Sequence, residues 1–250
     1  MKKVNVVCFY WEGDRWKSDF SGEMPKDESY RAILHKTGEV SLELASQYVN
    51  NLYHGMKRNS TVPFDFICFT NEELTLDEGV ERRNFPFLTT AGVLPRLYMF
   101  SPESGLFGRQ TLCLDLDVII CGDMDPLLSY DGLFCARSKF KPREHWKLDG
   151  DVMSFRAGEE VAKIFWEPFI KDVDAAVEMV KGRERYWVRH VANDLAERWE
   201  NVAPGTVVSY KWHGLRFPEL ARKASVISCH GYPRPHQVKI PWIKKHWEAA

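Results

Sequence analysis

The chain has 250 residues, of which 44% are hydrophobic and 28% charged, and its formal net charge is −1 at pH 7. This balance is typical of a soluble globular protein, and the length suits one domain with a substantial core. A charge so close to zero provides no global field that would favour nucleic acid or an anionic membrane.

The six cysteines form no C-x-x-C pair and mostly lie in apolar runs. We therefore expect free thiols in a reducing, cytoplasmic compartment. The N-terminus enters a strand pattern directly, and Asp14 and Arg15 soon interrupt it. We expect neither a signal peptide nor a transmembrane segment.

The first third of the chain alternates strand-like and helix-like segments. Residues 4–10 form a near-continuous apolar run, typical of a strand covered on both faces, and a polar, aromatic loop follows it. Ser41 can cap a helix over Leu42–Arg58, where apolar residues recur at helical spacing. A second strand is predicted over Phe64–Thr70, and a short helix over Leu94–Phe100.

Two carboxylates, Asp115 and Asp117, stand inside an apolar run that predicts one central strand over Thr111–Cys121. They are separated by one residue, so on an extended strand they point to the same side. Burying two unpaired charges side by side is costly, and a divalent cation removes that cost. Oxygen ligands suit Mg²⁺ or Mn²⁺, which commonly bridge to substrate phosphates. Alternatively, the two carboxylates cap a loop or pair with arginine.

Beyond this strand, the same alternation continues and predicts an α/β fold with a mostly parallel or mixed sheet. The basic, aromatic tail Pro241–Trp247 either docks onto the domain or touches a membrane surface. Strands are predicted over Leu133–Arg137, Val152–Phe155, Val207–Tyr210 and Ala224–Cys229, and helices over Glu159–Phe169, Val173–Val180 and His190–Trp199.

Polar residues near the later elements are further candidates. A predicted strand delivers His230, Gly231 allows close backbone approach to a ligand, and Arg234 can grip a phosphate with its fork of donors. A neutral histidine is also a plausible third metal ligand. Asp151, in a polar turn before a strand, and Asp194, near a predicted helix start, could act on a substrate or have purely structural roles.

The order of these features resembles a GT-A glycosyltransferase, closest to the glycogenin-like and galactosyltransferase-like members of family 8. The resemblance covers residues 4–236 and leaves 237–250 as a tail. It rests on Leu114-Asp115-Leu116-Asp117 at the D-x-D position, its continuation Gly122–Leu127, Arg96 on the preceding helix, Asp149–Met153 at the acceptor-side segment, Asn193-Asp194 at the acidic D-Q pair, and His230–Pro235 at the late H-x-x-G-x-x-K-P loop.

The resemblance implies a single Rossmann-like GT-A domain over 1–250, with a mostly parallel central sheet flanked by helices. It implies transfer of a sugar from a nucleotide diphosphate donor, UDP-linked by family habit, to an unknown acceptor, with retention. Asp115, Asp117 and His230 would hold Mn²⁺ or Mg²⁺. Asp151 and Asp194 would orient the donor sugar or the acceptor. The donor site would comprise Phe9, Tyr10, Trp11, Asn71, Arg96, Leu116, Gly231 and Arg234.

The chain departs from the family pattern in the late loop, where His230 directly precedes Gly231 and Arg234 replaces lysine. Two other functions stay open. One is a haloacid-dehalogenase-type phosphatase with Asp115 as nucleophile, although Val118 stands where that motif usually has threonine. The other is a nucleotide-sugar binding protein without turnover.

Overall fold

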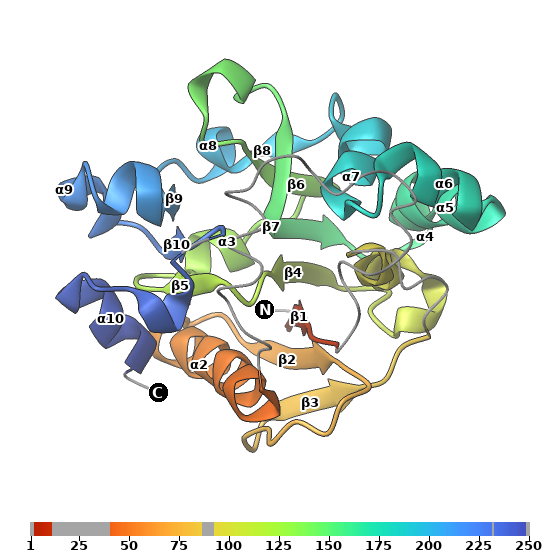
Figure 1. Ribbon diagram of the computed structural model, residues 1–250. Coiled ribbons are helices and arrows are strands. Elements are labelled where there is room, and N and C mark those ends of the chain that lie inside the picture. Colours follow the sequence, from red (N-terminus) through yellow and green to blue (C-terminus); the bar gives the residue numbers. More distant parts are fainter. Residues whose placement is uncertain (1–2, 12–40, 87–92, 232, 249–250) are drawn as a thin grey trace.

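The computed structural model describes residues 3–11, 41–86, 93–231 and 233–248, and within them two sheets organise the chain (Figure 1). The larger sheet has the strand order β3-β2-β1-β4-β7-β6-β8, and the smaller has the order β5-β10-β9. The large-sheet strands are β1 Val4–Phe9, β2 Phe64–Phe69, β3 Val80–Arg83, β4 Gln110–Leu114, β6 Phe134–Ser138, β7 Leu148–Arg156 and β8 Glu197–Arg198, and the small-sheet strands are β5 Val118–Ile120, β9 Val207–Ser209 and β10 Val226–Ser228.

The large sheet is parallel in its first half and mixed in its second. β3, β2, β1 and β4 run parallel to one another. β7 runs antiparallel to both β4 and β6, and β6 runs parallel to β8. Every residue of β1 is buried, as its continuous apolar run predicts for a strand covered on both faces. The predicted α/β class with a mostly parallel sheet is confirmed.

Helices cover both faces of the large sheet, and each face has its own core. On one face α2 (Leu42–Asn59) buries Ala45, Val49 and Leu52 against β1 and β2. Ser41 begins this helix as predicted, because its hydroxyl accepts a hydrogen bond from the backbone N–H of Leu44 at 3.2 Å. The opposite face is covered by the 3₁₀-helix η1 (Leu94–Phe100), α4 (Glu159–Val161), the π-helical turn η4 (Ala162–Trp166), α5 (Glu167–Lys171), α6 (Val173–Val180) and α7 (Glu184–Ala192).

The predicted single strand over Thr111–Cys121 is wrong, because the chain changes sheets within it. β4 ends at Leu114 between β1 and β7, and β5 then pairs antiparallel with β10 in the small sheet. The three residues between them, 115–117, belong to neither strand. The two carboxylates therefore lie in the crossing between two sheets rather than along one extended strand.

Two other predicted boundaries are also wrong. The helix expected over His190–Trp199 is instead the end of α7, a turn, β8 and the short helix α8 (Trp199–Val202). β7 begins at Leu148, so Asp151 lies within a strand and not in a turn. The remaining helices are α3 (Asp125–Leu128), α9 (Pro218–Ala221), α10 (Pro241–Glu248), the π-helical turn η5 (Tyr210–Gly214) and the 3₁₀ turns η2 (Pro102–Ser104), η3 (Pro142–Glu144) and η6 (Pro235–Gln237).

The basic, aromatic tail docks onto the domain as α10. Ile243 is 0% exposed and Trp247 is 4% exposed. The ring centroid of Trp247 lies 4.9 Å from that of Tyr48 on α2. Docking, one of the two predicted roles of this tail, is therefore confirmed. All six cysteines are free, as expected. Across the described residues, no helix has the length and apolar character needed to span a bilayer.

Candidate active site

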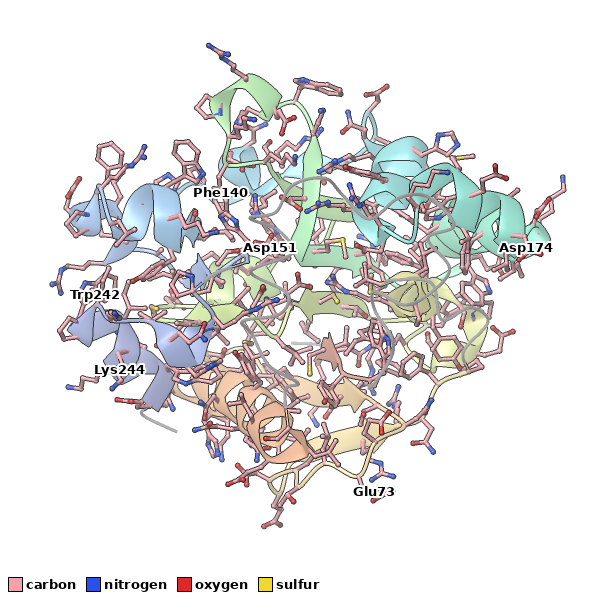
Figure 2. The ribbon with its side chains drawn as sticks, in the orientation of Figure 1. Glu73, Phe140, Asp151, Asp174, Trp242 and Lys244 are labelled. Carbon is pink, nitrogen blue, oxygen red and sulfur yellow. The ribbon has the colours of Figure 1, made fainter. Side chains whose placement is uncertain are left out.

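A cavity of about 420 Å³ lies where β1 and β4 end. Parallel strands bring their carboxyl ends to one edge of a sheet, where α/β folds usually bind ligands. Asp151, from β7, lines the cavity and lies near the centre of the molecule, whereas Glu73, Asp174 and Lys244 lie at its periphery (Figure 2). The predicted site residues that line the cavity are Phe9, Tyr10, Trp11, Arg96, Asp115, Leu116, Asp117, Asp151, His230, Gly231 and Arg234.

Two predicted site residues do not line this cavity. Asn71 closes the turn after β2, because its side chain exchanges hydrogen bonds with the backbone of Phe85. Asp194 is exposed in the turn after α7, where it accepts a hydrogen bond from the Asn193 side chain. Its expected place near a helix start is wrong, since α7 ends at Ala192. Residues 12–16 of the loop after β1, also expected near the nucleotide, lie outside the described residues.

The aromatic residues at the end of β1 form a packed wall of the cavity. Phe9 is 7% exposed, Tyr10 5% and Trp11 4%. The ring of Phe9 stacks on Phe69 at a centroid distance of 4.8 Å, and the ring of Trp11 meets Phe85 edge-on. These rings are held in place by the core before any ligand binds.

Asp115 pairs with an arginine from the helix before its strand. Arg96 Nη1 lies 2.5 Å from Asp115 Oδ1, and Arg96 Nη2 donates to the backbone oxygen of Gly150 at 2.8 Å. The pKa of Asp115 is raised to about 8: burial raises it most, the charge of Arg96 lowers it, and the nearby carboxylates of Asp117, Asp151 and Glu184 raise it. The site therefore crowds carboxylates around Asp115.

Asp117 pairs with an arginine from the far end of the chain. Arg234 Nη1 lies 2.6 Å from Asp117 Oδ2. The other carboxylate oxygen, Oδ1, is buried and has no hydrogen-bond partner within the described residues. Asp117 therefore keeps one unsatisfied acceptor inside the cavity wall, which is unusual for a buried polar atom.

Asp151 is held by a buried ion pair from the neighbouring strand β6. Arg137 Nε donates to Asp151 Oδ1 at 2.6 Å, and Arg137 Nη2 reaches Asp149 Oδ2 at 3.3 Å. Burial alone would raise the pKa of Asp151, but the charge and hydrogen bond of Arg137 lower it below its ordinary value. The guanidinium of Arg137 also lies 3.6 Å from the ring centroid of Phe140.

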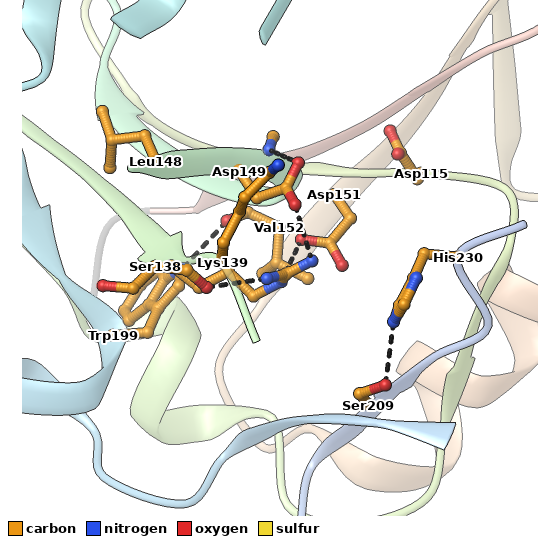
Figure 3. Close-up of polar contacts among 12 residues, drawn as sticks. Asp115, Ser138, Lys139, Leu148, Asp149, Asp151, Val152, Trp199, Ser209 and His230 are labelled. Carbon is orange, nitrogen blue, oxygen red and sulfur yellow. Dashed lines mark hydrogen bonds and ion pairs between the residues drawn. The ribbon is translucent and has the colours of Figure 1, made fainter. Parts of the chain in front are cut away.

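His230 lies across the cavity from Asp151 (Figure 3). Its Nε2 lies 2.8 Å from Ser209 Oγ, and its ring stacks on Phe140 at a centroid distance of 5.6 Å. Burial and then the positive charge of Arg137 lower the pKa of His230. The imidazole is therefore neutral at pH 7 and able to use a ring nitrogen as a ligand.

Several charged residues of this cavity were not predicted, among them Arg137 and Glu184. Arg137 could have been found, because it directly follows the apolar run Phe134–Ala136, just as Asp115 directly follows the apolar residues of another strand. Glu184 gives no such signal, since it stands in the polar stretch 181–185. It is nevertheless 2% exposed, lines the cavity and keeps Oε1 without a hydrogen-bond partner in the described part of the chain.

No protein-family model and no curated protein matches this sequence. Solved structures do match its fold. The glycosyltransferase GlyE of Streptococcus pneumoniae TIGR4 superposes with a TM-score of 0.60 at 12% identity, over 100% of this chain and 62% of GlyE. The chain has a glycosyltransferase fold. This is the fold that the sequence resemblance to GT-A enzymes implied.

Two further glycosyltransferases share this fold. The bifunctional glycosyltransferase WbbM has a TM-score of 0.58 at 10% identity, over 98% of this chain and 50% of WbbM. The galactosyltransferase LgtC, solved with donor and acceptor sugar analogues, has a TM-score of 0.56 at 9% identity, over 98% of this chain and 95% of LgtC. The chain thus spans well under the full length of GlyE and WbbM and nearly the full length of LgtC.

Proposed function

We propose that this protein is a metal-dependent glycosyltransferase that moves a sugar from a nucleotide diphosphate donor, UDP-linked, to an acceptor. The observation that carries the proposal is the cavity itself. In a glycosyltransferase fold, it gathers Asp115, Asp117, His230 and Arg234 at the ends of β4 and β10. These side chains are of the types that hold a divalent cation and a diphosphate.

The chemistry of the donor set suits Mn²⁺ or Mg²⁺. Asp115 and Asp117 supply carboxylate oxygens, and the neutral His230 supplies nitrogen. Metal-bound histidines usually engage their other ring nitrogen in a hydrogen bond, as His230 Nε2 does with Ser209. The buried, unpartnered Oδ1 of Asp117 is an acceptor that a cation would satisfy.

Arginines hold the two carboxylates in the unliganded protein. Among the described residues, no three histidine, cysteine or acidic side chains already converge as a metal site. A cation bound at Asp117 Oδ1 would compete with Arg234 for the charge of this carboxylate and so weaken the ion pair at Oδ2. The freed guanidinium, 34% exposed, would then be available to the diphosphate.

The position of each residue in the cavity suggests its role in the reaction. Arg234 donates hydrogen bonds to the diphosphate leaving group, where negative charge grows as the glycosidic bond breaks. A bound cation would add charge neutralisation at the same oxygens. Arg96 holds Asp115 toward the cavity, and the packed rings at the end of β1 would border the nucleotide base. Asp151, fixed by Arg137, would orient the sugar. The sequence resemblance adds retention of the anomeric configuration to the proposal.

The phosphatase alternative has less support. Its nucleophile would be Asp115, but Val118 stands where that motif usually has threonine. Arg96 also occupies Asp115 Oδ1 at 2.5 Å. The matching solved structures are glycosyltransferases.

A donor screen tests the proposed function. Thermal shift with UDP-, GDP-, CMP- and dTDP-sugars, with and without Mn²⁺, should single out one donor, because a ligand that binds the folded state raises its apparent stability. The selected donor is then incubated with a panel of acceptors, and the anomeric configuration of the product is assigned by NMR. Binding without hydrolysis or transfer would instead favour the non-catalytic binder, and no metal-dependent shift with any donor would contradict the proposal.

A further inference from the structure

The wall of the cavity opposite the late loop is formed by the turn between α6 and α7. Lys181 and Gly182 both adopt left-handed backbone conformations, with φ values of 52° and 68°. The backbone oxygen of Gly182 accepts a hydrogen bond from the N–H of Val93 at 2.9 Å, which anchors the turn beside η1. Lys181 and Arg183 line the cavity from this turn, and Glu184 and Arg185 line it from the start of α7.

The cations of this wall gather around one tyrosine. The guanidinium carbons of Arg183, Arg185 and Arg189 lie 5.3, 5.7 and 5.2 Å from the ring centroid of Tyr186. Arg183 donates to the Tyr186 hydroxyl at 2.9 Å, and Arg189 Nε donates to the backbone oxygen of Leu148 at 2.6 Å. Arg189 Nη2 is buried and has no partner among the described residues.

Several other arginines of the molecule are ion-paired. Arg82 pairs with Glu73, and Arg109 pairs with Asp65. By contrast, Arg183, Arg185 and Arg189 form no salt bridge with any carboxylate in the described ranges 3–11, 41–86, 93–231 and 233–248. Like charges held this close repel one another until an anion joins them.

The pKa values of Tyr186 and Arg189 reflect the positive charge of these arginines. Burial alone would raise the pKa of Tyr186, but the hydrogen bond from Arg183 and the three guanidinium charges lower it. Burial lowers the pKa of Arg189, and the neighbouring Arg185 lowers it further, while Asp149 acts in the opposite direction. The field at Tyr186 therefore favours a negative group, while the carboxylates of Asp149 and Glu184 oppose it nearby.

Glu184 supplies a second and independent sign of a ligand. Its carboxyl is 2% exposed and lines the cavity, and its Oε1 has no hydrogen-bond partner within the described chain. Arg96 Nη1 lies 4.0 Å from Oε2, too far for a hydrogen bond. A sugar hydroxyl would satisfy such an oxygen. Next to it, two guanidiniums that form no salt bridge within the described residues would bind a carboxylate or phosphate on the same sugar.

We infer that the α7 wall recognises a sugar that carries a carboxylate or phosphate group, bound by Arg183 and Arg185. This inference rests on the proposed function and names the substrate class of that site. The donor diphosphate is assigned to Arg234 at the other wall, and β7 lies between α7 and β10 (Figure 1). The anion at the α7 wall is therefore a second one, and it belongs either to the transferred sugar or to the acceptor.

Calorimetric titration of the full chain in the presence of Mn²⁺ tests both possible sources of the anion, the transferred sugar and the acceptor. Glucose 6-phosphate is compared with glucose as acceptor-side probes, and UDP-glucuronate with UDP-glucose as donor-side probes. The wild-type protein should bind one anionic probe at least about tenfold more tightly than its neutral partner, because guanidinium–anion hydrogen bonds are charge-assisted. Raising the salt concentration should weaken that preference.

Matched variants test whether Arg183 and Arg185 cause the preference for the anionic probe. The double variant Arg183→Gln/Arg185→Gln should lose it, and Arg185→Gln alone should reduce it. Arg216→Gln should keep it, because Arg216 stacks on Trp212 at 4.9 Å and lies outside the cavity. Arg185 makes no hydrogen bond to any described residue, so the single variant removes no internal contact of that kind and decides the matter should the double variant fold poorly.

Three outcomes overturn the inference: equal binding of anionic and neutral probes, an unchanged preference in the Arg185→Gln variant, or a preference that only Arg234→Gln abolishes. Its failure is separable from failure of the proposed function. An anionic preference without any sugar transfer would contradict the transferase and leave this inference standing. Transfer between neutral sugars, at rates that the double variant does not change, would contradict this inference and leave the transferase proposal standing.

Discussion

Two arginine–aspartate pairs in the same cavity show how burial changes the role of one interaction. Arg137 and Asp151 have side chains that are 1% and 5% exposed, whereas Arg234 and Asp117 are 34% and 18% exposed. Both pairs meet at 2.6 Å. The buried pair cannot open without leaving a charge out of water, so it acts as scaffold. The open pair can exchange partners at little cost, so it can take part in binding.

The largest expected effect comes from breaking the buried pair. Arg137→Met leaves Asp151 and Asp149 without their counter-ion, and we expect it to lower the free energy of unfolding by about 3–5 kcal/mol. Urea denaturation measures the loss. Arg137→Met/Asp151→Leu should recover part of it, because the uncompensated buried charge is removed. A loss below about 1 kcal/mol in the single variant would mean that this pair is no scaffold.

The open pair should behave in the opposite way. Arg234→Gln should change the free energy of unfolding by less than about 1 kcal/mol, because the pair is partly solvated. It should weaken UDP binding by about tenfold or more, because a charge-assisted contact to phosphate is lost. Arg222→Gln is the matched control, since Arg222 stacks on Trp242 outside the cavity. Strong destabilisation with unchanged UDP affinity would reverse the roles assigned to the two pairs.

Much of the frame of the molecule could be predicted because it depends on local patterns. The apolar run of β1 and the capped, periodic helix α2 were both predicted within one residue of their observed ends. The crossing at Asp115–Asp117 could not be, because it depends on β10, more than a hundred residues later in the chain, drawing β5 into a second sheet. A continuous apolar run carries no information about which partner each half of it will find.

The site, like the fold, could be predicted where it depends on local sequence patterns and not where it depends on distant parts of the chain. The acidic pair and the late loop with His230 were predicted to share one cavity, and they do. Pairing of the two carboxylates with arginine was one of the alternatives left open, but no local pattern selects Arg234 as the partner of Asp117. Glu184 could not be singled out, because a glutamate among arginines is typical of an exposed helix start. Asp194 was misplaced since nothing in its neighbourhood marks the end of α7 at Ala192.

The smallest expected effect is a pH dependence that distinguishes Asp115 from the two pairs; it is small because the Asp115 side chain is 35% exposed and water screens its interactions. Its pKa is raised from 3.8 to about 8, so between these values the folded state holds a proton that the unfolded state has released. The contribution of Asp115 to stability should therefore fall as pH rises from about 4 to about 8 and then level off. Asp115→Asn should remove this slope. Urea denaturation at several pH values measures it, and identical slopes in both proteins would contradict the assignment.

The central claim is that Asp117 and its surroundings hold a cation together with a nucleotide diphosphate. The most direct measurement is calorimetric titration of UDP with and without Mn²⁺ into three proteins: the wild type, Asp117→Asn, and Asp174→Asn as a control from the exposed surface of α6. Mn²⁺ should tighten UDP binding in the wild type and in Asp174→Asn, and should tighten it much less in Asp117→Asn, because an uncharged amide oxygen binds a hard cation more weakly than a carboxylate does. Equal enhancement by Mn²⁺ in all three proteins, or none in any of them, would contradict the account.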